Sequence, residues 1–246
     1  MNETLRLMQS HRSNRSYKPD IVSDQMLDQI VEAAYRGPTS VNSQQVSLVV
    51  VRDPVKRARI AEIAGGQPWI AEAPVFITVV VDFHKTRLGV TKAGQTQVAH
   101  ESVEGLVAGT LDAGIALGNL MTAARSLGLG IVPIGGIRRD PQAMIDLLAL
   151  PPLTFPVAGV CLGHIAEEVA QKPRLGIASF RHDECYHPEV LPSLIAAYDD
   201  ALVQYWQQIG RPEGLPWSAR LAEYYQTVYF PKVKAVAAKQ GLVCDK

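Results

Sequence analysis

One apolar run constrains the fold more strongly than any other feature of the chain. Residues 75–81 read ValPheIleThrValValVal, rich in β-branched side chains and without any alternation of polar and apolar positions. This pattern is typical of a strand buried on both faces of a sheet. The apolar stretch that contains it, residues 73–81, is far too short to span a bilayer. We therefore expect a sheet inside a folded domain and no membrane segment.

Helix and strand patterns alternate along the rest of the chain. Ser23 is the expected N-cap of a helix over residues 23–34, where apolar side chains recur at helical spacing. Pro54 is expected to open a helix that continues to residue 64. Further strands are expected over 46–51, 130–136 and 155–163, and further helices over about 99–126, 140–149, 188–209 and 218–240. The sequence predicts one mixed α/β domain over residues 1–246, with a helical extension over residues 188–246.

The charges of the chain balance, with 24 Lys and Arg against 24 Asp and Glu. Proteins that bind nucleic acids or membrane surfaces rely on net positive charge, so neither class is expected here. Cys161, Cys185 and Cys244 lack CxxC spacing, which argues against a disulfide framework or a zinc site. The N-terminus has no apolar core or small-residue cleavage site, so no signal peptide is expected. A reducing cytoplasm is the expected location.

The helical extension carries one stripe of apolar and aromatic side chains: Tyr198, Leu202, Tyr205 and Trp206. Packing against the body of the protein accounts for such a stripe. A subunit interface also accounts for it, because aromatic residues concentrate in interfaces. In that second interpretation the helix over 99–126 joins the interface, since the small residues in its centre allow close approach of neighbouring backbones. Both interpretations stay open.

Residues 10–17, SerHisArgSerAsnArgSerTyr, concentrate side chains that bind anions. A second basic group, Lys172 and Arg174, flanks Pro173. A guanidinium binds phosphate through two hydrogen bonds, and lysine adds a point charge. The sequence contains no GxxxxGK[ST] loop, GxGxxG, HExxH or nucleophile-elbow motif. The chain therefore predicts an anion site without a standard phosphate loop, and a solvated surface charge is the alternative for each basic residue alone.

The stretch HisArgSerAsnArgSerTyr resembles the N-terminal signature HRSxRxF/Y of the nitroreductase superfamily, in particular its oxygen-insensitive NADPH nitroreductases and NADPH-dependent FMN reductases. Similar motifs follow in order at residues 39–44, 65–67, 126–130, 133–138, 161–163 and 172–175. The resemblance covers nearly the whole chain. It implies an α+β fold with a central sheet flanked by helices, and an obligate homodimer that holds FMN non-covalently at the subunit interface.

The resemblance also implies which residues would bind FMN. The ribityl-phosphate end would contact His11, Arg12, Ser13, Arg15, Lys172 and Arg174. Such a set is physically reasonable, because a dianion removed from water needs several charge-assisted donors. The isoalloxazine ring would contact Thr39, Ser40, Val41 and Gln67 of the other subunit, and the run Pro133, Ile134, Gly135 and Gly136. The family commonly has another serine at the position of Val41.

The implied activity needs little acid–base machinery from the protein, so no catalytic side chain and no metal ligand is assigned. Hydride would pass from NADPH through FMN, in ping-pong order, to a nitroaromatic, a quinone, free flavin or another small oxidant. Two alternatives stay open. One is a flavin enzyme of the same fold with another acceptor, such as a dehalogenase or a supplier of reduced FMN. The other is a protein that stores or senses flavin without turnover.

Selection of NADPH is expected to involve Arg211. Some relatives carry an Arg-Pro pair implicated in nucleotide binding where this chain has Phe230 and Pro231. NADPH differs from NADH by a 2′-phosphate, so a preference for NADPH requires a cation. Residues 210–216, GlyArgProGluGlyLeuPro, are expected to form an exposed loop between two helices. We expect Arg211 to contact the 2′-phosphate, and a solvated loop charge is the alternative.

Overall fold

A computed structural model of the chain describes residues 1–242. The chain divides into two compact units. The first comprises Met1–Glu168 and Phe230–Lys246, and it contains the sheet. The second comprises Val169–Tyr229 and is helical.

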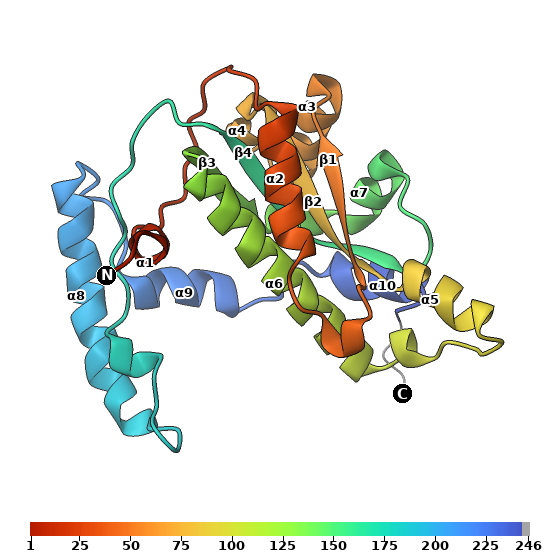
Figure 1. Cartoon of the computed structure of the whole chain (residues 1–246). Helices are drawn as coiled ribbons and strands as arrows, with labels where there is room; N and C mark the ends of the chain where they lie inside the picture. The colour runs from red at the N-terminus through yellow and green to blue at the C-terminus, as the bar shows by residue number, and fades with distance from the viewer. Residues whose placement is uncertain (243–246) are drawn as a thin grey trace. The chain divides into compact units, whose positions relative to one another are not determined.

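The first unit is built on a four-stranded sheet in the order β1-β2-β4-β3. All neighbouring strands are antiparallel, and they run through the middle of the unit in Figure 1. The strand bounds are β1 Val46–Val51, β2 Val75–Asp82, β3 Leu129–Ile134 and β4 Thr154–His164. Residues 75–81 are all buried, as their uninterrupted apolar pattern predicted. The strands expected at 46–51, 130–136 and 155–163 are confirmed, although β3 ends at Ile134 because Gly135 and Gly136 leave the sheet.

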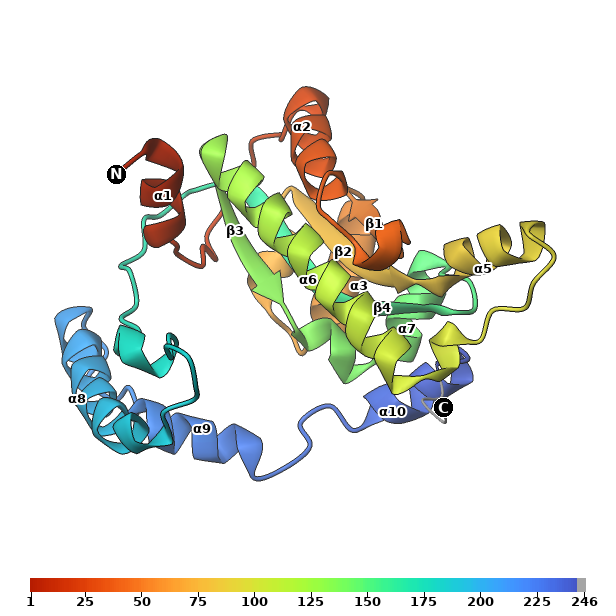
Figure 2. The same cartoon turned by 60° about the horizontal axis from the view of Figure 1, so that its bottom comes forward.

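Helices cover both faces of the sheet. The helices α2 (Asp24–Tyr35) and α6 (Val103–Ser126) lie side by side on one face in both views (Figures 1 and 2). The opposite face is covered by α3 (Pro54–Ile63), α4 (Pro68–Glu72) and α7 (Pro141–Leu148). Side chains along β2 alternate between the two cores, with Phe76 in one and Ile77 in the other. The mixed α+β fold with a helix-flanked sheet is therefore confirmed.

The helix starts follow from local capping. The Ser23 hydroxyl accepts a hydrogen bond from the Met26 amide at 3.2 Å, as expected for the N-cap of α2. The Asp53 carboxylate caps α3, whose first residue is Pro54. Residues 99–101 form a separate 3-10 turn, so α6 begins at Val103 and not at about 99.

The helix α6 is long and apolar enough to cross a membrane by length and composition, with a mean hydropathy of 1.3 over an 18-residue window. Its contacts identify it as a core helix of the first unit. Leu120 and Ala124 are buried against the sheet. A Cβ atom at Gly109 would lie only 2.8 Å from Cγ1 of Val81, so this glycine allows close contact between α6 and β2.

Three parts of the chain differ from the expectation. A first helix, α1 (Glu3–Gln9), precedes residues 10–17, and α5 (Phe83–Lys92) follows β2 directly. The single helix expected over 218–240 was wrong: α9 (Trp217–Tyr225) ends before Pro231, and α10 (Lys232–Lys239) begins after it. Proline lacks the N–H group that a continuous helix would require.

The cysteines have different environments. Cys161 lies buried in β4 and Cys185 is exposed, both as free thiols. Burial raises the pKa of the Cys161 thiol. Cys244 lies outside the described residues.

In the second unit, α8 (Leu191–Gln208) packs against α9. Tyr198 and Leu202 are buried, and the rings of Tyr198 and Trp217 meet edge to face with centroids 6.1 Å apart. The hydroxyl of Tyr205 and the indole N–H of Trp206 both donate to backbone carbonyls of the same unit. The aromatic stripe of α8 is thus used for packing inside its own unit.

Candidate functional site

The stretch over residues 10–17 is joined to the sheet region at Asn14 and Tyr17. The Asn14 amide donates to the Ile131 carbonyl at 2.9 Å, and Tyr17 forms a bridge with Ile165. The buried Tyr17 hydroxyl donates to the Asn14 carbonyl at 2.7 Å. Burial raises the pKa of Tyr17, so the phenol stays protonated and keeps this hydrogen bond. The basic stretch is therefore attached at Asn14 to the edge strand β3 and at Tyr17 to the segment after β4.

The two arginines of this stretch have different surroundings. The guanidinium of Arg15 lies 5.5 Å from the centroid of the Trp69 ring. Arg12 is half-buried and donates from Nη1 to the Ser10 carbonyl at 3.0 Å. Arg125, in the last turn of α6, donates from Nη2 to the Ser10 hydroxyl at 3.0 Å. The structure thus brings Arg12 beside Arg125, and it brings Arg15 to α4.

Gln67 and Gly136 are brought into direct contact. The Gln67 amide donates from Nε2 to the Ala64 carbonyl at 3.0 Å. A Cβ atom at residue 136 would lie 2.6 Å from that Nε2 and 2.7 Å from the Ala64 carbonyl oxygen. Only glycine allows this approach without a shift of backbone. Trp69 follows two residues after Gln67, so Arg15, α4 and the glycine turn form one surface region.

The four residues from 133 to 136 differ in their exposure to solvent. Pro133 is exposed on β3, an edge strand where the missing N–H of proline is tolerated. Ile134 is buried in the core with its side chain among α3 and α4 residues. Gly135 and Gly136 are half-buried. The backbone turn and Pro133 are therefore accessible to a ligand, whereas the Ile134 side chain belongs to the core.

The loop over residues 39–45 is anchored by a buried carboxylate. Asp112, on α6, accepts hydrogen bonds from the Ser40 amide at 3.1 Å and from Nε2 of Gln45 at 3.0 Å. Val41 adopts a positive φ of 48°, which is strained for a β-branched residue, and its side chain is 95% exposed. An apolar side chain held outward in a strained conformation is a feature found at binding sites.

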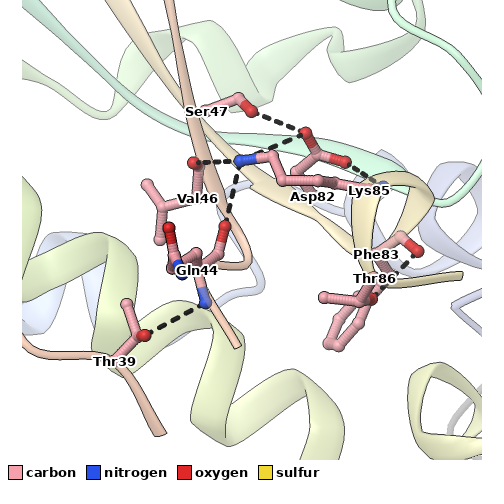
Figure 3. A network of polar contacts seen from close by, with 8 residues as sticks. All are labelled: Thr39, Gln44, Val46, Ser47, Asp82, Phe83, Lys85 and Thr86. Atoms are coloured by element: carbon pink, nitrogen blue, oxygen red, sulfur yellow. Dashed lines mark hydrogen bonds and ion pairs between the residues drawn. The ribbon is translucent and has the colours of Figure 1, made fainter. Parts of the chain in front are cut away.

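A second network fixes the end of the same loop (Figure 3). Lys85 donates from Nζ to the carbonyls of Gln44 and Val46, each at 2.9 Å. The Gln44 amide donates to the Thr39 hydroxyl at 3.0 Å. The loop that carries Thr39, Ser40 and Val41 is thus held at both ends by polar contacts.

In the second unit, Lys172 lies beside the residues that support the Arg211 loop. Its ammonium group lies 4.6 Å from the centroid of the Trp206 ring. The Arg211 amide donates to the Trp206 carbonyl at 2.8 Å, and the indole of Trp206 donates to Leu215 at 3.0 Å. Arg211 is exposed, as expected for the loop over 210–216. Trp206 therefore connects the loop of Arg211 with Lys172.

Arg174 has an exposed side chain whose Nη1 donates to the Lys172 carbonyl at 3.1 Å. The backbone between the two cations is fixed because the Tyr198 hydroxyl donates to the Pro173 carbonyl at 3.0 Å. Both cations line one concave surface of the second unit, together with Gln204, Tyr205 and Gln208. Lys172 and Arg174 thus share a site within this unit.

The donor set of the first unit fits an anionic, acceptor-rich group such as FMN. Three buried N–H groups of the first unit have no hydrogen-bond partner among the described residues: Nε of Arg12, Nδ2 of Asn14 and Nε1 of Trp69. All three are donors, and buried donors are normally paired. Phosphate oxygens and ring carbonyls are the acceptors that would pair them.

Two residues of this region were not found by sequence reasoning. Asp112 and Arg125 are single charged residues on a long apolar helix. No sequence motif marks Asp112 as functional. An arginine in the last turn of a helix interacts favourably with the helix dipole, so the position of Arg125 alone does not indicate a binding role. Their roles depend on contacts with loops far away in the sequence.

The chain is similar to known proteins over most of its length. The model of the nitroreductase family matches residues 8–164, and the model of its C-terminal domain matches residues 172–245. The FMN reductase [NAD(P)H] of Bacillus subtilis is 40% identical over 249 residues, covering 100% of both chains. The oxygen-insensitive NADPH nitroreductase of Salmonella typhimurium is 34% identical and covers 84% of this chain and 83% of its own. The solved structure of NfrA2 from B. megaterium superposes with a TM-score of 0.97 at 39% identity, over 100% of both chains.

Proposed function

Because this chain belongs to the nitroreductase family, we propose that it is an NAD(P)H-dependent flavin oxidoreductase of the FMN reductase and nitroreductase type. Its cofactor is FMN, bound non-covalently, and NADPH is its co-substrate. Its acceptors are small molecules such as nitroaromatics, quinones or free flavin. It works in the cytoplasm.

The observation that carries this proposal is the set of buried N–H donors without acceptors around residues 12–15 and Trp69. Unpaired buried donors destabilise a fold unless a ligand accepts their hydrogen bonds. A group that offers several acceptors and negative charge fits this set of donors. FMN offers both, in its phosphate and in its ring carbonyls.

FMN, held by these residues, would supply the redox chemistry for hydride transfer between NADPH and the acceptor. The residues of the chain bind and orient the reactants. Arg15 and Trp69 provide a charged and an aromatic contact at the edge of α4. The half-buried turn at Gly135 and Gly136 carries no side chains of its own, so its backbone amides can approach a ligand. Lys172 and Arg174 provide positive charge for the phosphate.

A homodimer is part of the proposal. The outer face of α6 exposes Val103, Val107 and Leu111, each more than half accessible, on one stripe at a spacing of four residues. A patch of this kind is typical of a subunit interface. The strained loop with Val41 would then reach the flavin of the other subunit. Gln67 was expected there too, but it contacts Gly136 of its own chain and would therefore serve the flavin held by that chain.

Purified protein should test the proposal through its colour. Bound FMN makes the chain yellow, and NADPH added without oxygen should bleach it within the mixing time of the experiment. A quinone or a nitroarene added next should restore the flavin absorbance. The two half-reactions can be followed separately, as ping-pong order requires.

A yellow protein that NADPH and NADH both fail to bleach would contradict the proposal and favour flavin storage or sensing. A protein that bleaches but is reoxidised by neither a quinone, a nitroarene nor free flavin would point to another acceptor on the same fold.

A further inference from the structure

A tight turn in the second unit presents an exposed thiol. Cys185 is a free, exposed cysteine in the segment that precedes α8. Its amide donates to the Asp183 carbonyl at 2.8 Å, and the intervening Glu184 adopts a positive φ of 65°. This conformation is strained for a residue other than glycine, and strained backbone is concentrated at functional positions. The turn thus holds Cys185 at the surface of the unit.

The thiol lies beside an oriented imidazole ring. Sγ of Cys185 lies 3.8 Å from Nε2 of His187, which is within hydrogen-bond distance for sulfur. On the other side of the ring, Nδ1 of His187 lies 3.1 Å from Oε1 of Glu189. A carboxylate only accepts hydrogen bonds, so Nδ1 carries a proton and the lone pair of the neutral ring is at Nε2. His187 is therefore placed to accept the proton of the Cys185 thiol.

The surroundings of His187 stabilise the ring after it has accepted this proton. Nε2 lies 3.3 Å from the Asp183 carbonyl oxygen, which accepts a hydrogen bond from Nε2 once that atom is protonated. The Glu189 carboxylate balances the new positive charge. A cysteine, a base and a carboxylate that orients the base together form an arrangement that activates nucleophiles.

His182 adds a donor that no described protein group uses. Its Nδ1 accepts the His187 amide at 3.2 Å, so the ring proton is on Nε2. That Nε2 atom is buried and has no hydrogen-bond partner among residues 1–242. Buried donors are normally paired, so this one fits an acceptor of a molecule bound beside the cluster. Within the same residues, no three histidine, cysteine or carboxylate side chains are grouped to hold a metal ion, so the cluster fits thiol chemistry better than metal binding.

We infer that Cys185 is a site of reversible mixed-disulfide formation, with His187 as its base and Glu189 as the residue that positions the base. The co-reactant is a low-molecular-weight disulfide with carboxylate groups, such as oxidised glutathione, whose carboxylates offer acceptors to His182.

The exchange step needs no further oxidant. The Cys185 sulfur attacks one sulfur of the disulfide while its proton passes to Nε2 of His187. A new S–S bond forms, the S–S bond of the co-reactant breaks, and the departing thiolate takes the proton from Nε2. Cys185 is thereby oxidised and the released half of the co-reactant is reduced to a thiol. This chemistry does not depend on the proposed function.

The first arm of the test locates the reactive thiol. The full chain with Cys244→Ser, which keeps Cys161 and Cys185, is incubated with oxidised glutathione, and peptide mass spectrometry maps the adduct. We expect glutathione on Cys185 and its removal by dithiothreitol. Cys161 is buried and should stay unmodified. An adduct on Cys161 alone, or on neither cysteine, would overturn the inference.

The second arm measures the rate of adduct formation. His187→Ala should slow it roughly tenfold or more, because loss of a general base costs at least this factor. Added imidazole should restore part of the rate in His187→Ala and raise the wild-type rate much less, a rescue that a folding defect would not show. Glu189→Gln should also slow the reaction, and Glu189→Asp, which keeps the carboxylate, should recover part of the rate. His84→Gln removes a half-buried histidine on α5 and, as the matched control, should react as the wild type.

Equal rates in the wild type and in His187→Ala would overturn the inference. Bleaching of the flavin by NADPH is followed in the same samples. Protein that bleaches but forms no adduct would contradict the assignment of Cys185 alone. An adduct on Cys185 in protein that NADPH does not bleach would support this assignment and contradict the proposed function.

Discussion

The backbone at Gly136 approaches the side chain of Gln67 so closely that a Cβ atom there would lie 2.6 Å from Nε2. This contact joins the turn after β3 to the segment before α4, on the surface that also carries Trp69 and Arg15. The geometry of the proposed flavin site therefore depends on having a glycine, without a side chain, at position 136.

Gly136→Ala should disturb this contact. The new methyl group must displace the Gln67 amide or the Ala64 carbonyl, and overpacking of this kind costs about 1–3 kcal/mol. We expect a lower melting temperature and weaker retention of FMN through dialysis. Gly89→Ala is the matched control, because nothing lies within 4 Å of a Cβ atom at that helical position. Equal flavin retention in the two variants would contradict the assignment of this turn.

Arg15→Ala should weaken FMN binding. Loss of one charged hydrogen bond costs about 1.5–3 kcal/mol, and Arg174→Ala should act in the same direction. The measurement is the flavin content after exhaustive dialysis. Arg59→Ala serves as the control, since Arg59 is exposed on α3 and pairs with Glu62. Full flavin retention in both Arg15→Ala and Arg174→Ala would argue against the assignment of these two residues to the FMN phosphate.

The elements with a strong local signal were predictable from the sequence. The buried pattern of residues 75–81, the Ser23 cap and the Asp53-Pro54 start are local features, and each appears in the structure where it was expected. The pairing of β2 with β4, and the antiparallel direction of all strands, were not predicted, because strand pairing joins residues far apart in the sequence. The break before Pro231 was missed although proline is itself a local signal.

In the candidate site, too, local features were predictable and contacts between distant parts of the sequence were not. The motif at residues 11–17 was visible as a cluster of anion-binding side chains, but the separate surroundings of Arg12 and Arg15 were not. Asp112 and Arg125 could not be singled out, because a lone charge on an apolar helix becomes meaningful only when its tertiary neighbours are known.

Leu111→Asp should separate the proposed dimer. Leu111 is 63% exposed on the outer stripe of α6, and a carboxylate buried there by a second copy would lack a partner. We expect a monomer in light-scattering measurements at micromolar protein, with reduced FMN content. Leu88→Asp on α5 changes a residue that is 59% exposed outside the stripe and should leave the mass unchanged. Wild-type protein that is monomeric and fully active across a dilution series would contradict the dimer proposal.

Asp140→Asn should reduce stability in a pH-dependent way. Asp140 caps α7 and binds Lys232 at 2.6 Å, and the hydrogen bond from Lys232 lowers the pKa of the carboxyl, aided by the Ala143 amide. A folded-state pKa below the unfolded value of about 3.9 means that the carboxylate stabilises the fold above that pH. The contribution is lost as the pH falls through the folded-state pKa.

The expected loss at pH 7 is about 0–1 kcal/mol, because the ion pair is partly exposed and asparagine still caps a helix. Urea unfolding of both proteins at pH 7 and below pH 4 checks this. The difference between wild type and Asp140→Asn should shrink at the acidic pH, and a constant difference would show that the ion pair is not its source.

Arg211→Ala should alter the choice between NADPH and NADH. Arg211 is exposed on the loop over 210–216, whose backbone is fixed by the Trp206 carbonyl and by the bond from the Trp206 indole to Leu215. A loop held at Trp206 can present the guanidinium in a constant position. The 2′-phosphate is the only charged group that distinguishes the two nucleotides, so a cation that contacts it affects NADPH alone.

We expect the KM for NADPH to rise roughly tenfold or more, which corresponds to loss of one charged hydrogen bond of about 1.5 kcal/mol. The KM for NADH and the affinity for FMN should stay nearly unchanged. Arg220→Ala is the matched control, because Arg220 lies in the first turn of α9 with its charge engaged by Glu223 at 2.8 Å. Steady-state kinetics with both nucleotides measure the effect. If Arg211→Ala raises the KM for NADPH and the KM for NADH equally, or raises neither, the cation that selects NADPH lies elsewhere.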